Sequence, residues 1–359
     1  MPPHLLASIS FHGFGHIAQS APVVNALVRR IPDLRVTLQC AAPLAVLRNH
    51  FHCAFMHAQQ VVDLGVVNHG ALRVLRDDTA RLYADFHADW DARLARATAQ
   101  LRAWQPDVVL ANVPYLTLAA AAQARIPAVA MCSLNWADIY AYYCGKRAGA
   151  PEMLAQMHTG YAAAQIFLQP EPSLPMPDLA NTQPIGPLAR VGRERRAELR
   201  QRLNVDTGTR LVVVALGGIK TAVTLDAWPR VDGVRWLAQA DWNIRHPDAL
   251  AWDQLGWSFI DVLRSADAFI TKPGYGSFAE AACNGVPVLY VTYEDWPEQA
   301  GLVKWLPQHV PCAAITAEQF ARGEFMNTLN ELLSIPSPLP LAPSGVEQAA
   351  DRLEAYLRR

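Results

Sequence analysis

Residues 265–299 constrain the fold more than any other part of the chain, because they read as strand, glycine turn, helix, strand and loop. Residues 268–270 are apolar and short, like a buried parallel strand, and residues 286–291 repeat that pattern. Between them, Gly274 and Gly276 allow the backbone to turn sharply and to approach a ligand closely. A strand, turn, helix and strand in this order are typical of an open parallel α/β sheet.

The helix of this unit, expected from Ser277 onward, predicts a binding site for a diphosphate. Its first N–H groups have no partner within the helix, so its N-terminus carries about half a positive charge and suits an anion. The loop after the second strand lies at the edge where open α/β sheets bind ligands. The residues expected at this site come from the turn, the helix and that loop: Lys272, Gly274, Tyr275, Gly276, Ser277, Glu280, Glu298 and Gln299.

The spacing of Ser277 and Glu280 also fits an ordinary capping box. In that motif the carboxylate accepts a hydrogen bond from the backbone N–H of the cap residue. The two roles are compatible with each other, and taken alone the pair favours the cap. The surrounding motif favours ligand binding.

With Gly285-Val286-Pro287 and the pair Glu298 and Gln299, the segment resembles the nucleotide-sugar-binding half of GT-B glycosyltransferases. The resemblance implies that Glu280 holds the ribose hydroxyls, that Ser277 and the turn amides face the diphosphate, and that the Glu–Gln pair contacts the sugar. Many members of this family have a histidine just before the glycine turn. This chain has Lys272 and a proline there, and the lysine is expected to serve as the cation.

Size and charge favour a two-domain globular protein without a polyanionic partner. The 359 residues exceed the size at which a single core stops growing. With 31 Lys and Arg against 32 Asp and Glu, the net charge is −1, so no field attracts nucleic acid or anionic lipid. We expect one domain over residues 1–187, a second over 188–344, and a final amphipathic helix over 345–359 that crosses back to the first domain.

Cysteine usage and hydropathy indicate a soluble cytoplasmic protein. The six cysteines are scattered, without a CxxC pair or the spacing of zinc ligands, which is typical of buried thiols in a reducing compartment. The N-terminus lacks a basic region followed by a long apolar stretch, and no apolar run reaches the roughly 18 residues that a membrane span requires. A peripheral membrane contact stays open.

Alternating strands and helices over most of the chain predict a parallel, doubly wound sheet in each half. Strands are expected at 5–11, 34–40, 61–67, 107–111, 126–132, 211–216 and 234–238, and helices at 17–30, 79–104 and 258–265. The proline-rich run 169–187 is expected to connect the halves. The basic run 193–202 is expected to be a solvated helix face.

A second glycine turn, HGFGH at 12–16, follows the first strand. Gly13 and Gly15 fit the start of a dinucleotide-binding GxGxxG/A pattern, but the second strand ends without the acidic residue that binds the ribose, which counts against NAD. His16 matches the histidine of the acceptor loop in several GT-B families, so the resemblance implies a base or a substrate contact. A histidine near a helix N-terminus has its pKa lowered and stays neutral. The alternative is that His16 only caps the turn.

Plant-type sugar transferases orient this histidine with an Asp at the exit of the strand that here spans 107–111. This chain has Asn112 at that position. An amide orients an imidazole but does not stabilise its charged form as a carboxylate does. Asp138 is therefore a second candidate for the orienting group.

The resemblance extends over both halves of the chain. The segments 112–114 and 133–143 and the glycine turns at 12–16 and 272–276 are similar to the glycosyltransferase-like domain found at the N-terminus of plant arabinokinases. Similarity to the bacterial enzyme that adds N-acetylglucosamine to lipid I is more distant. The match implies the GT-B fold, in which two Rossmann-like domains face each other across a cleft.

Further donor contacts are expected from a third glycine turn and from the loop before a short helix: Gly218, Lys220, Thr221, Phe259 and Ile260. The resemblance implies that backbone atoms of residues 257–260 read the base and select uracil, while Trp257 is equally well a core residue. No DxD motif occurs in a suitable loop. Helix N-termini with Lys220 or Lys272 are expected to replace a metal ion, and no cofactor is expected besides the donor substrate.

These features predict a metal-independent glycosyltransferase that moves a sugar from a nucleoside diphosphate, expected to be UDP, to an unidentified acceptor hydroxyl on a small molecule or glycolipid. Three other functions stay open: a non-catalytic nucleotide-sugar sensor, a GT-B epimerase that acts on the nucleotide sugar itself, and a NAD-dependent oxidoreductase. The loops within residues 48–91 that would face the acceptor carry no specific code.

Overall fold

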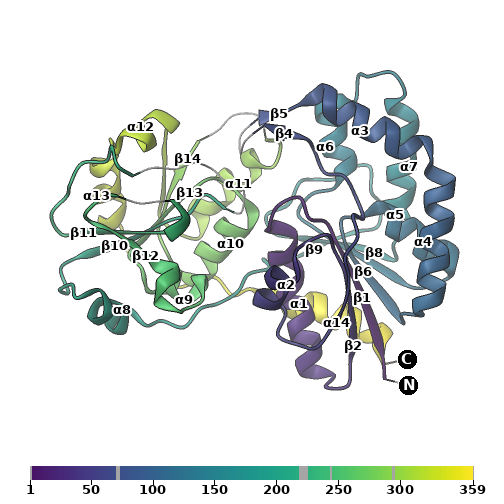
Figure 1. Cartoon of the computed structure of the whole chain (residues 1–359), viewed down its shortest axis with the longest axis horizontal. Helices are drawn as coiled ribbons and strands as arrows, with labels where there is room; N and C mark the ends of the chain where they lie inside the picture. The colour runs from purple at the N-terminus through teal and green to yellow at the C-terminus, as the bar shows by residue number, and fades with distance from the viewer. Residues whose placement is uncertain (1, 70–72, 218–224, 243–244, 293–295, 359) are drawn as a thin grey trace. The chain divides into compact units, whose positions relative to one another are not determined.

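The computed structural model describes residues 2–69, 73–217, 225–242, 245–292 and 296–358, which form two compact α/β units (Figure 1). Unit 1 comprises Met1–His69, Arg73–Leu188 and Ser344–Arg359, and Ala189–Pro343 belong to unit 2. The chain passes from unit 1 to unit 2 between Leu188 and Ala189. Within the described ranges, no helix is both long and apolar enough to cross a lipid bilayer.

Unit 1 is built on a seven-stranded parallel sheet with the order β3-β2-β1-β6-β7-β8-β9. Its strands are β1 (His4–Ile9), β2 (Arg35–Gln39), β3 (Met56–Ala58), β6 (Val108–Asn112), β7 (Ala128–Met131), β8 (Ile166–Pro170) and β9 (Thr182–Ile185). Every residue of β1, β6 and β7 is buried, as expected for central strands that are covered on both faces. A short antiparallel pair, β4 (Asn68–His69) and β5 (Arg73–Val74), belongs to the same unit.

The helices of unit 1 are α1 (Gly15–Arg30), α2 (Leu44–His50), α3 (Arg76–Ala88), α4 (Trp90–Trp104), α5 (Tyr115–Ala124), α6 (Trp136–Cys144), α7 (Ala150–Ala162) and α14 (Ser344–Leu357). Figure 1 shows α1 beside α14, and α4, α5 and α7 grouped together away from them. The last helix docks through an apolar stripe that includes Ala349 and Leu353, both fully buried. Arg30 of α1 forms ion pairs with Glu347, Asp351 and Glu354 of α14.

Unit 2 contains a six-stranded parallel sheet with the order β12-β11-β10-β13-β14-β15. Its strands are β10 (Arg210–Val214), β11 (Val234–Ala238), β12 (Ala249–Ala251), β13 (Ala268–Thr271), β14 (Val288–Val291) and β15 (Cys312–Ile315). Its helices are α8 (Arg196–Leu203), α9 (Phe259–Ser265), α10 (Tyr275–Asn284), α11 (Gln299–Trp305), α12 (Ala317–Arg322) and α13 (Met326–Ser334), with short 3₁₀ turns at Ala240–Trp242, Trp252–Leu255 and Leu306–Gln308. Trp228, Trp236 and Phe325 pack edge to face in the core of this unit.

Two expected elements are wrong in unit 1. Residues 61–67 form no strand, and the third strand is β3 instead. The run has the composition of a strand, but Gly65 adopts φ +60° and Asp63 is buried and polar, so the segment does not extend. The long helix expected at 79–104 is two helices, α3 and α4, which are separated at Asp89.

The proline-rich run 169–187 is not only a connection, because it contains β9. Pro184 is tolerated in this strand because β9 is the last strand of the sheet and needs to donate fewer hydrogen bonds. The basic run 193–202 does form a helix, α8, but it is not simply solvated. Arg196 and Arg200 of this helix pair with Asp267, whose side chain is 5% exposed.

Candidate functional site

In unit 1, the strand order places the HGFGH turn beside the end of β6. The chain moves from β1 outward to β2 and later returns to β6 on the other side of β1, so β1 lies at a topological switch point. Open α/β sheets bind ligands in the crevice at the carboxyl ends of such strands. His16 follows β1, and Asn112 is the last residue of β6. Gly13 adopts φ +83° in the turn between β1 and α1, a backbone conformation that favours glycine.

The imidazole of His16 is held by a chain of three hydrogen bonds. Its Nδ1 lies 2.8 Å from Asn112 Oδ1. Asn112 Nδ2 donates to Gln19 Oε1 at 3.3 Å, and Gln19 Nε2 donates to Ser133 Oγ at 3.0 Å. Because the amide N–H₂ of Asn112 is directed at Gln19, its oxygen accepts from His16 Nδ1–H, which leaves the ring lone pair on Nε2.

Burial keeps this imidazole neutral. His16 is 6% exposed, and desolvation lowers its pKa to about 4, although the hydrogen bond that it donates to Asn112 acts in the opposite direction. A neutral histidine with its lone pair on Nε2 is the form that accepts a proton from a hydroxyl. The geometry at the end of β6 therefore suits a general base.

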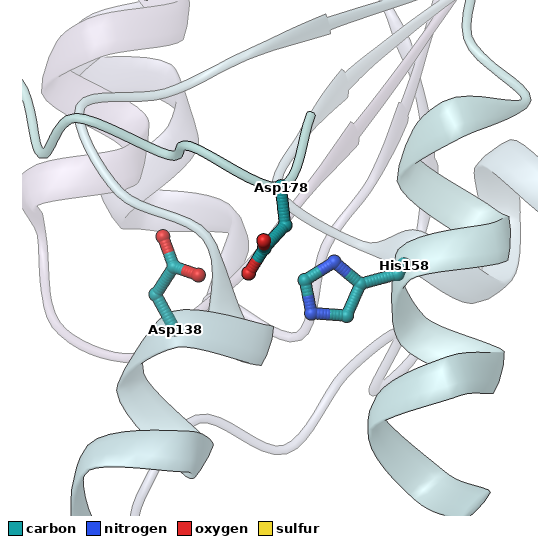
Figure 2. A group of neighbouring side chains, drawn as sticks. All are labelled: Asp138, His158 and Asp178. Atoms are coloured by element: carbon teal, nitrogen blue, oxygen red, sulfur yellow. The ribbon is translucent and has the colours of Figure 1, made fainter. Parts of the chain in front are cut away.

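Asp138, the second expected orienting group, makes no contact with His16. Its Oδ2 accepts a hydrogen bond from Asn135 Nδ2, and its backbone N–H donates to Asn135 Oδ1, the side chain that caps α6. Figure 2 shows its carboxylate facing His158 of α7 and Asp178 of the loop between β8 and β9. Asn112 occupies the orienting position instead, because β6 ends beside α1.

Among the residues that the structure describes, the group in Figure 2 is the one cluster of His, Cys, Asp and Glu side chains spaced like metal ligands. The ligand atoms of Asp138, His158 and Asp178 lie within 4.8 Å of one another. Carboxylate oxygen and imidazole nitrogen are ligands that zinc accepts. Asp178 is exposed, however, and exposed acidic groups are common without an ion.

A second buried group adjoins His16, and the sequence analysis did not identify it. Asp63 Oδ1 accepts from Ser10 Oγ at 2.9 Å, and Oδ2 accepts from Trp136 Nε1 at 2.7 Å. Burial raises the pKa of Asp63 to about 7, against the opposing effect of these two bonds. The ring of Trp136 packs against both His12 and His16. A lone acidic residue in an apolar run was the only sequence signal for this group.

In unit 2, the equivalent switch point lies at β10, which has β11 on one side and β13 on the other. Gly217 follows β10 with φ +80°, and Lys272 follows β13. A Cβ atom at Gly217 would lie 3.6 Å from Lys272 Cε, so the lysine side chain lies over this turn. Gly218, Lys220 and Thr221 lie outside the described residues.

Helix α10, expected from Ser277, begins two residues earlier. Gly274 is its N-cap and Tyr275 its first residue, so Ser277 and Gly276 lie within the first turn. No side-chain cap bond is present, and the expected capping box does not form. Half-buried Lys272 lies just before this helix start, and burial lowers the pKa of its amine.

Glu280 has a side-chain partner, Arg190, that the sequence did not indicate. Its Oε1 accepts from Arg190 Nε at 2.9 Å, and its side chain is 9% exposed. Asn284, one turn later, donates to the carbonyl of Arg190 and accepts from the N–H of Gly192. The segment 190–192 is thereby fixed along one face of α10, and an arginine lies beside the carboxylate expected at the ribose.

The remaining expected donor residues lie around the same sheet. Glu298 is buried and accepts from Trp296 Nε1 at 3.2 Å. Gln299 Oε1 is buried and has no hydrogen-bond partner among the residues that the structure describes. A buried amide oxygen without a donor costs free energy, and a ligand hydroxyl would relieve that cost.

Residues 257–260 form the loop expected to read the base, and their side chains lie in different surroundings. Trp257 is half-buried, and the guanidinium of Arg195 lies 3.8 Å from its ring centroid. Phe259 packs against Phe269, while Ile260 is buried. Trp257 is therefore a cation–π platform rather than a core residue.

A cavity of about 540 Å³ lies at the opposite edge of the unit 1 sheet. It is lined by residues that include Arg125, Pro127 and Tyr356. Pro127 precedes β7, whereas Asn112 ends β6, and parallel strands have their amino ends at one edge. This cavity is therefore distinct from the site at His16.

Comparisons with known proteins agree with this architecture. No protein-family model matches the chain. The L-arabinokinase of Arabidopsis thaliana is 23% identical over 353 residues, which cover 96% of this chain and 34% of the arabinokinase. The chain thus spans about a third of the length of this curated relative.

Solved structures resemble the chain over nearly its whole length. The glycosyltransferase of kitacinnamycin has a TM-score of 0.63 and 17% identity, and covers 99% of this chain and 100% of its own. The calicheamicin glycosyltransferase CalG4 has a TM-score of 0.62 and 17% identity, with 100% and 99% covered. UGT2 of Phytolacca americana, solved with UDP-2-fluoroglucose and pterostilbene, has a TM-score of 0.58 and 16% identity, with 99% and 94% covered.

The chain has the GT-B fold. The two parallel sheets of seven and six strands, each in its own unit, are the α/β units of this fold. The fold expected from the sequence is confirmed, as is the likeness to plant arabinokinase over this length.

Proposed function

We propose that the chain is a glycosyltransferase that moves a sugar from a nucleoside diphosphate to an acceptor hydroxyl, with His16 as the general base. The observation that carries the proposal is the neutral imidazole of His16, oriented by Asn112 at the switch point of a GT-B unit. Support also comes from solved structures with this fold that are named as glycosyltransferases.

In the proposed reaction, the acceptor hydroxyl gives its proton to His16 Nε2 while its oxygen bonds to the anomeric carbon of the donor sugar. The bond between that carbon and the diphosphate oxygen breaks, and the nucleoside diphosphate leaves with the electron pair. Asn112 keeps Nδ1 protonated and thus keeps the lone pair on Nε2. The acceptor is a small molecule or glycolipid whose identity the residues do not encode.

Unit 2 supplies the groups for the donor. The N-terminus of α10 with Lys272 offers positive potential for the diphosphate, which is where negative charge develops as the bond breaks. Gln299 Oε1 offers a buried acceptor for a sugar hydroxyl. We propose UDP as the nucleotide and transfer without a metal ion, with this positive potential in place of the cation.

A thermal-shift screen of nucleoside diphosphates and their sugars tests this function. We expect UDP or a UDP-sugar to raise the melting temperature through mass action on the native state, and Lys272→Met to weaken that shift. ADP serves as the comparison nucleotide, and added EDTA should change nothing. Hydrolysis of the bound sugar nucleotide, followed by chromatography, reports chemistry without a known acceptor.

The outcomes separate the proposal from its rivals. Binding without hydrolysis or transfer would favour the nucleotide-sugar sensor, and a new sugar nucleotide formed without acceptor would favour the epimerase. A flat response to every nucleoside diphosphate would contradict nucleotide-sugar binding altogether.

A further inference from the structure

The buried carboxylate of Asp63 joins two elements of unit 1 that border His16. Ser10, which donates to its Oδ1, follows β1 directly, and Trp136, which donates to its Oδ2, is the first residue of α6. The two distances, 2.9 and 2.7 Å, are those of well-formed hydrogen bonds. One side chain thus connects the glycine turn to the helix that packs against it.

The indole of Trp136 transmits this connection to both histidines. It is fully buried, with its ring centroid 5.3 Å from that of His12 and 5.6 Å from that of His16. A buried indole N–H requires an acceptor, and Asp63 provides it. With the N–H bound, the ring has one orientation, and it forms one wall of the space that His16 occupies.

The segment around Asp63 also packs directly on the turn. A Cβ atom at Gly65 would lie 2.6 Å from the ring of His12, so only a glycine allows this approach. Asn68 Nδ2 lies 3.3 Å from His12 Nε2. Residues 61–67, which lack regular structure, therefore form part of the site.

A carboxylate is a costly way to meet these needs. Among the described residues Asp63 has no ion-pair partner, and the titratable groups that sense its charge, Cys40, Tyr83, Tyr115 and Tyr161, are neutral acids. A buried carboxylate without a cation destabilises a fold. Stability alone does not account for an acid here.

We propose that Asp63 is a positioning residue for the base: it fixes the Trp136 indole, and the indole holds the His16 imidazole in the orientation set by Asn112. The proposal rests on the proposed function only for its kinetic readout. The role is geometric, so it requires an acceptor facing Trp136 Nε1 and a hydrogen-bonding group facing Ser10 Oγ rather than a negative charge.

Kinetics of sugar-nucleotide hydrolysis or transfer test this role with two Asp63 variants. We expect Asp63→Ala to lower kcat by about 10- to 100-fold with KM for the donor unchanged, because the base loses its alignment. Asp63→Asn should restore kcat to within about threefold, since its Oδ1 accepts from Trp136 Nε1 and its Nδ2 donates to Ser10 Oγ. An Asn variant as slow as the Ala variant would overturn the proposal in favour of an electrostatic role.

A double-mutant cycle tests the route through the indole. Trp136→Phe keeps a ring but removes the N–H, so it should lower kcat like Asp63→Ala, and the double variant should be no slower than either single one. If the two losses in kcat multiply in the double variant, Asp63 acts through a contact other than the indole. If Asp63→Ala does not fold, the kcat values of Trp136→Phe and Asp63→Asn still test the proposal. A low kcat in Trp136→Phe with a nearly wild-type kcat in Asp63→Asn would support it, and the reverse would overturn it.

A buried carboxylate in unit 2 provides the matched control. Asp267 holds Arg196 and Arg200, and Asp267→Asn should lower the melting temperature while leaving kcat unchanged well below it. A kcat loss in this control as large as that of Asp63→Ala would show that lost stability alone explains both, and would overturn the proposal.

NMR spectra, which do not depend on catalysis, test the positioning role of Asp63 separately from the proposed function. In ¹⁵N-histidine NMR spectra, with the signal assigned through His16→Gln, Asp63→Ala should split or broaden the His16 resonances, and Asp63→Asn should return them to the wild-type positions. An unchanged His16 signal in Asp63→Ala would overturn the positioning role even if the wild type transfers sugar. If the wild type neither hydrolyses nor transfers sugar, the proposed function fails while the spectra still decide about Asp63.

Discussion

At the scale of single residues, the site of unit 1 combines a neutral base with a buried acid in adjoining positions. Desolvation lowers the pKa of His16 to about 4 and raises that of Asp63 to about 7. The same physical cause acts in opposite directions because the charged form of one group is a cation and that of the other an anion. Burial therefore shifts each group towards its uncharged form.

Replacement of the base gives the most direct prediction at this scale. His16→Ala should reduce sugar transfer or donor hydrolysis by about 10²- to 10⁴-fold, the usual contribution of a general base. UDP should still raise the melting temperature, because the groups proposed to bind the donor belong to unit 2. His52→Ala, at an exposed position, is the control and should keep wild-type activity. Full activity in His16→Ala would refute the base assignment.

The pH dependence of stability gives a second prediction. Between pH 6.5 and about 4, His16 binds a proton in the unfolded state but stays neutral in the folded state. Its contribution to the free energy of unfolding therefore falls as the pH falls. Asp63 has the opposite sign, because between pH 7 and 3.8 the folded state binds the extra proton.

Between pH 4 and 6.5, His16 and Asp63 change the stability in opposite directions as the pH falls. Single variants separate the two contributions. Relative to wild type, Asp63→Asn should lose stability as the pH falls through this window, and His16→Gln should gain it, each with a slope of at most about 1.4 kcal/mol per pH unit. Urea unfolding at several pH values measures both slopes. The same sign in both variants would contradict these pKa directions.

At the scale of elements, α10 is tied to the segment before α8 rather than capped by its own side chains. Arg190 forms an ion pair with Glu280. Asn284 donates to the backbone carbonyl of Arg190 and accepts from the backbone N–H of Gly192. A helix whose first turn lacks side-chain caps keeps its N–H groups available for an anion. The ion pair with Arg190 fixes the position of the Glu280 carboxylate.

Breaking this ion pair should therefore cost more than a surface pair. Arg190→Met leaves a carboxylate that is 9% exposed without its cation, and we expect a loss of about 3 kcal/mol in unfolding free energy. The double variant with Glu280→Gln should recover most of that loss, because no charge is then left unpaired. Chemical denaturation of the two variants measures the difference. Equal stability of single and double variants would show that the pair contributes little.

At the scale of the whole molecule, the last segment of the chain belongs to unit 1. Helix α14 packs against α1, and Gly345 lies directly on the backbone of Gly186. Three acidic residues of α14 share the single guanidinium of Arg30. Unit 1 therefore needs residues from both ends of the described chain to complete its fold.

The close approach at Gly345 predicts a strong effect of one methyl group. A Cβ atom there would lie 1.9 Å from the carbonyl oxygen of Gly186, and backbone cannot yield as a side chain does. Gly345→Ala should displace α14 and lower the melting temperature, with a stability loss of about 1 to 3 kcal/mol or more. Gly301→Ala, where the new Cβ would meet no described atom within 4 Å, is the matched control. Limited proteolysis should cut residues 344–357 more readily in the first variant only.

The sequence by itself determined the fold class and most elements. Parallel strands buried on both faces are short apolar runs, so β6, β11 and β13 were visible from residues next to one another. The glycine turns were equally local, since Gly13 and Gly217 adopt positive φ in the loops that follow strands. His16 and Asn112 were identified by the resemblance to GT-B families, at positions at or after the ends of two strands.

Only the tertiary structure decided how side chains distant in sequence pair. Asp63 and Trp136 are 73 residues apart, and Arg190 and Glu280 are 90 apart, so no periodic pattern connects them. The choice of Asn112 over Asp138 as the partner of His16 depended on which strand ends beside α1. Such pairings follow from strand order and side-chain burial, which are properties of the packed sheet, whereas periodicity reports only the contacts that neighbouring residues make possible.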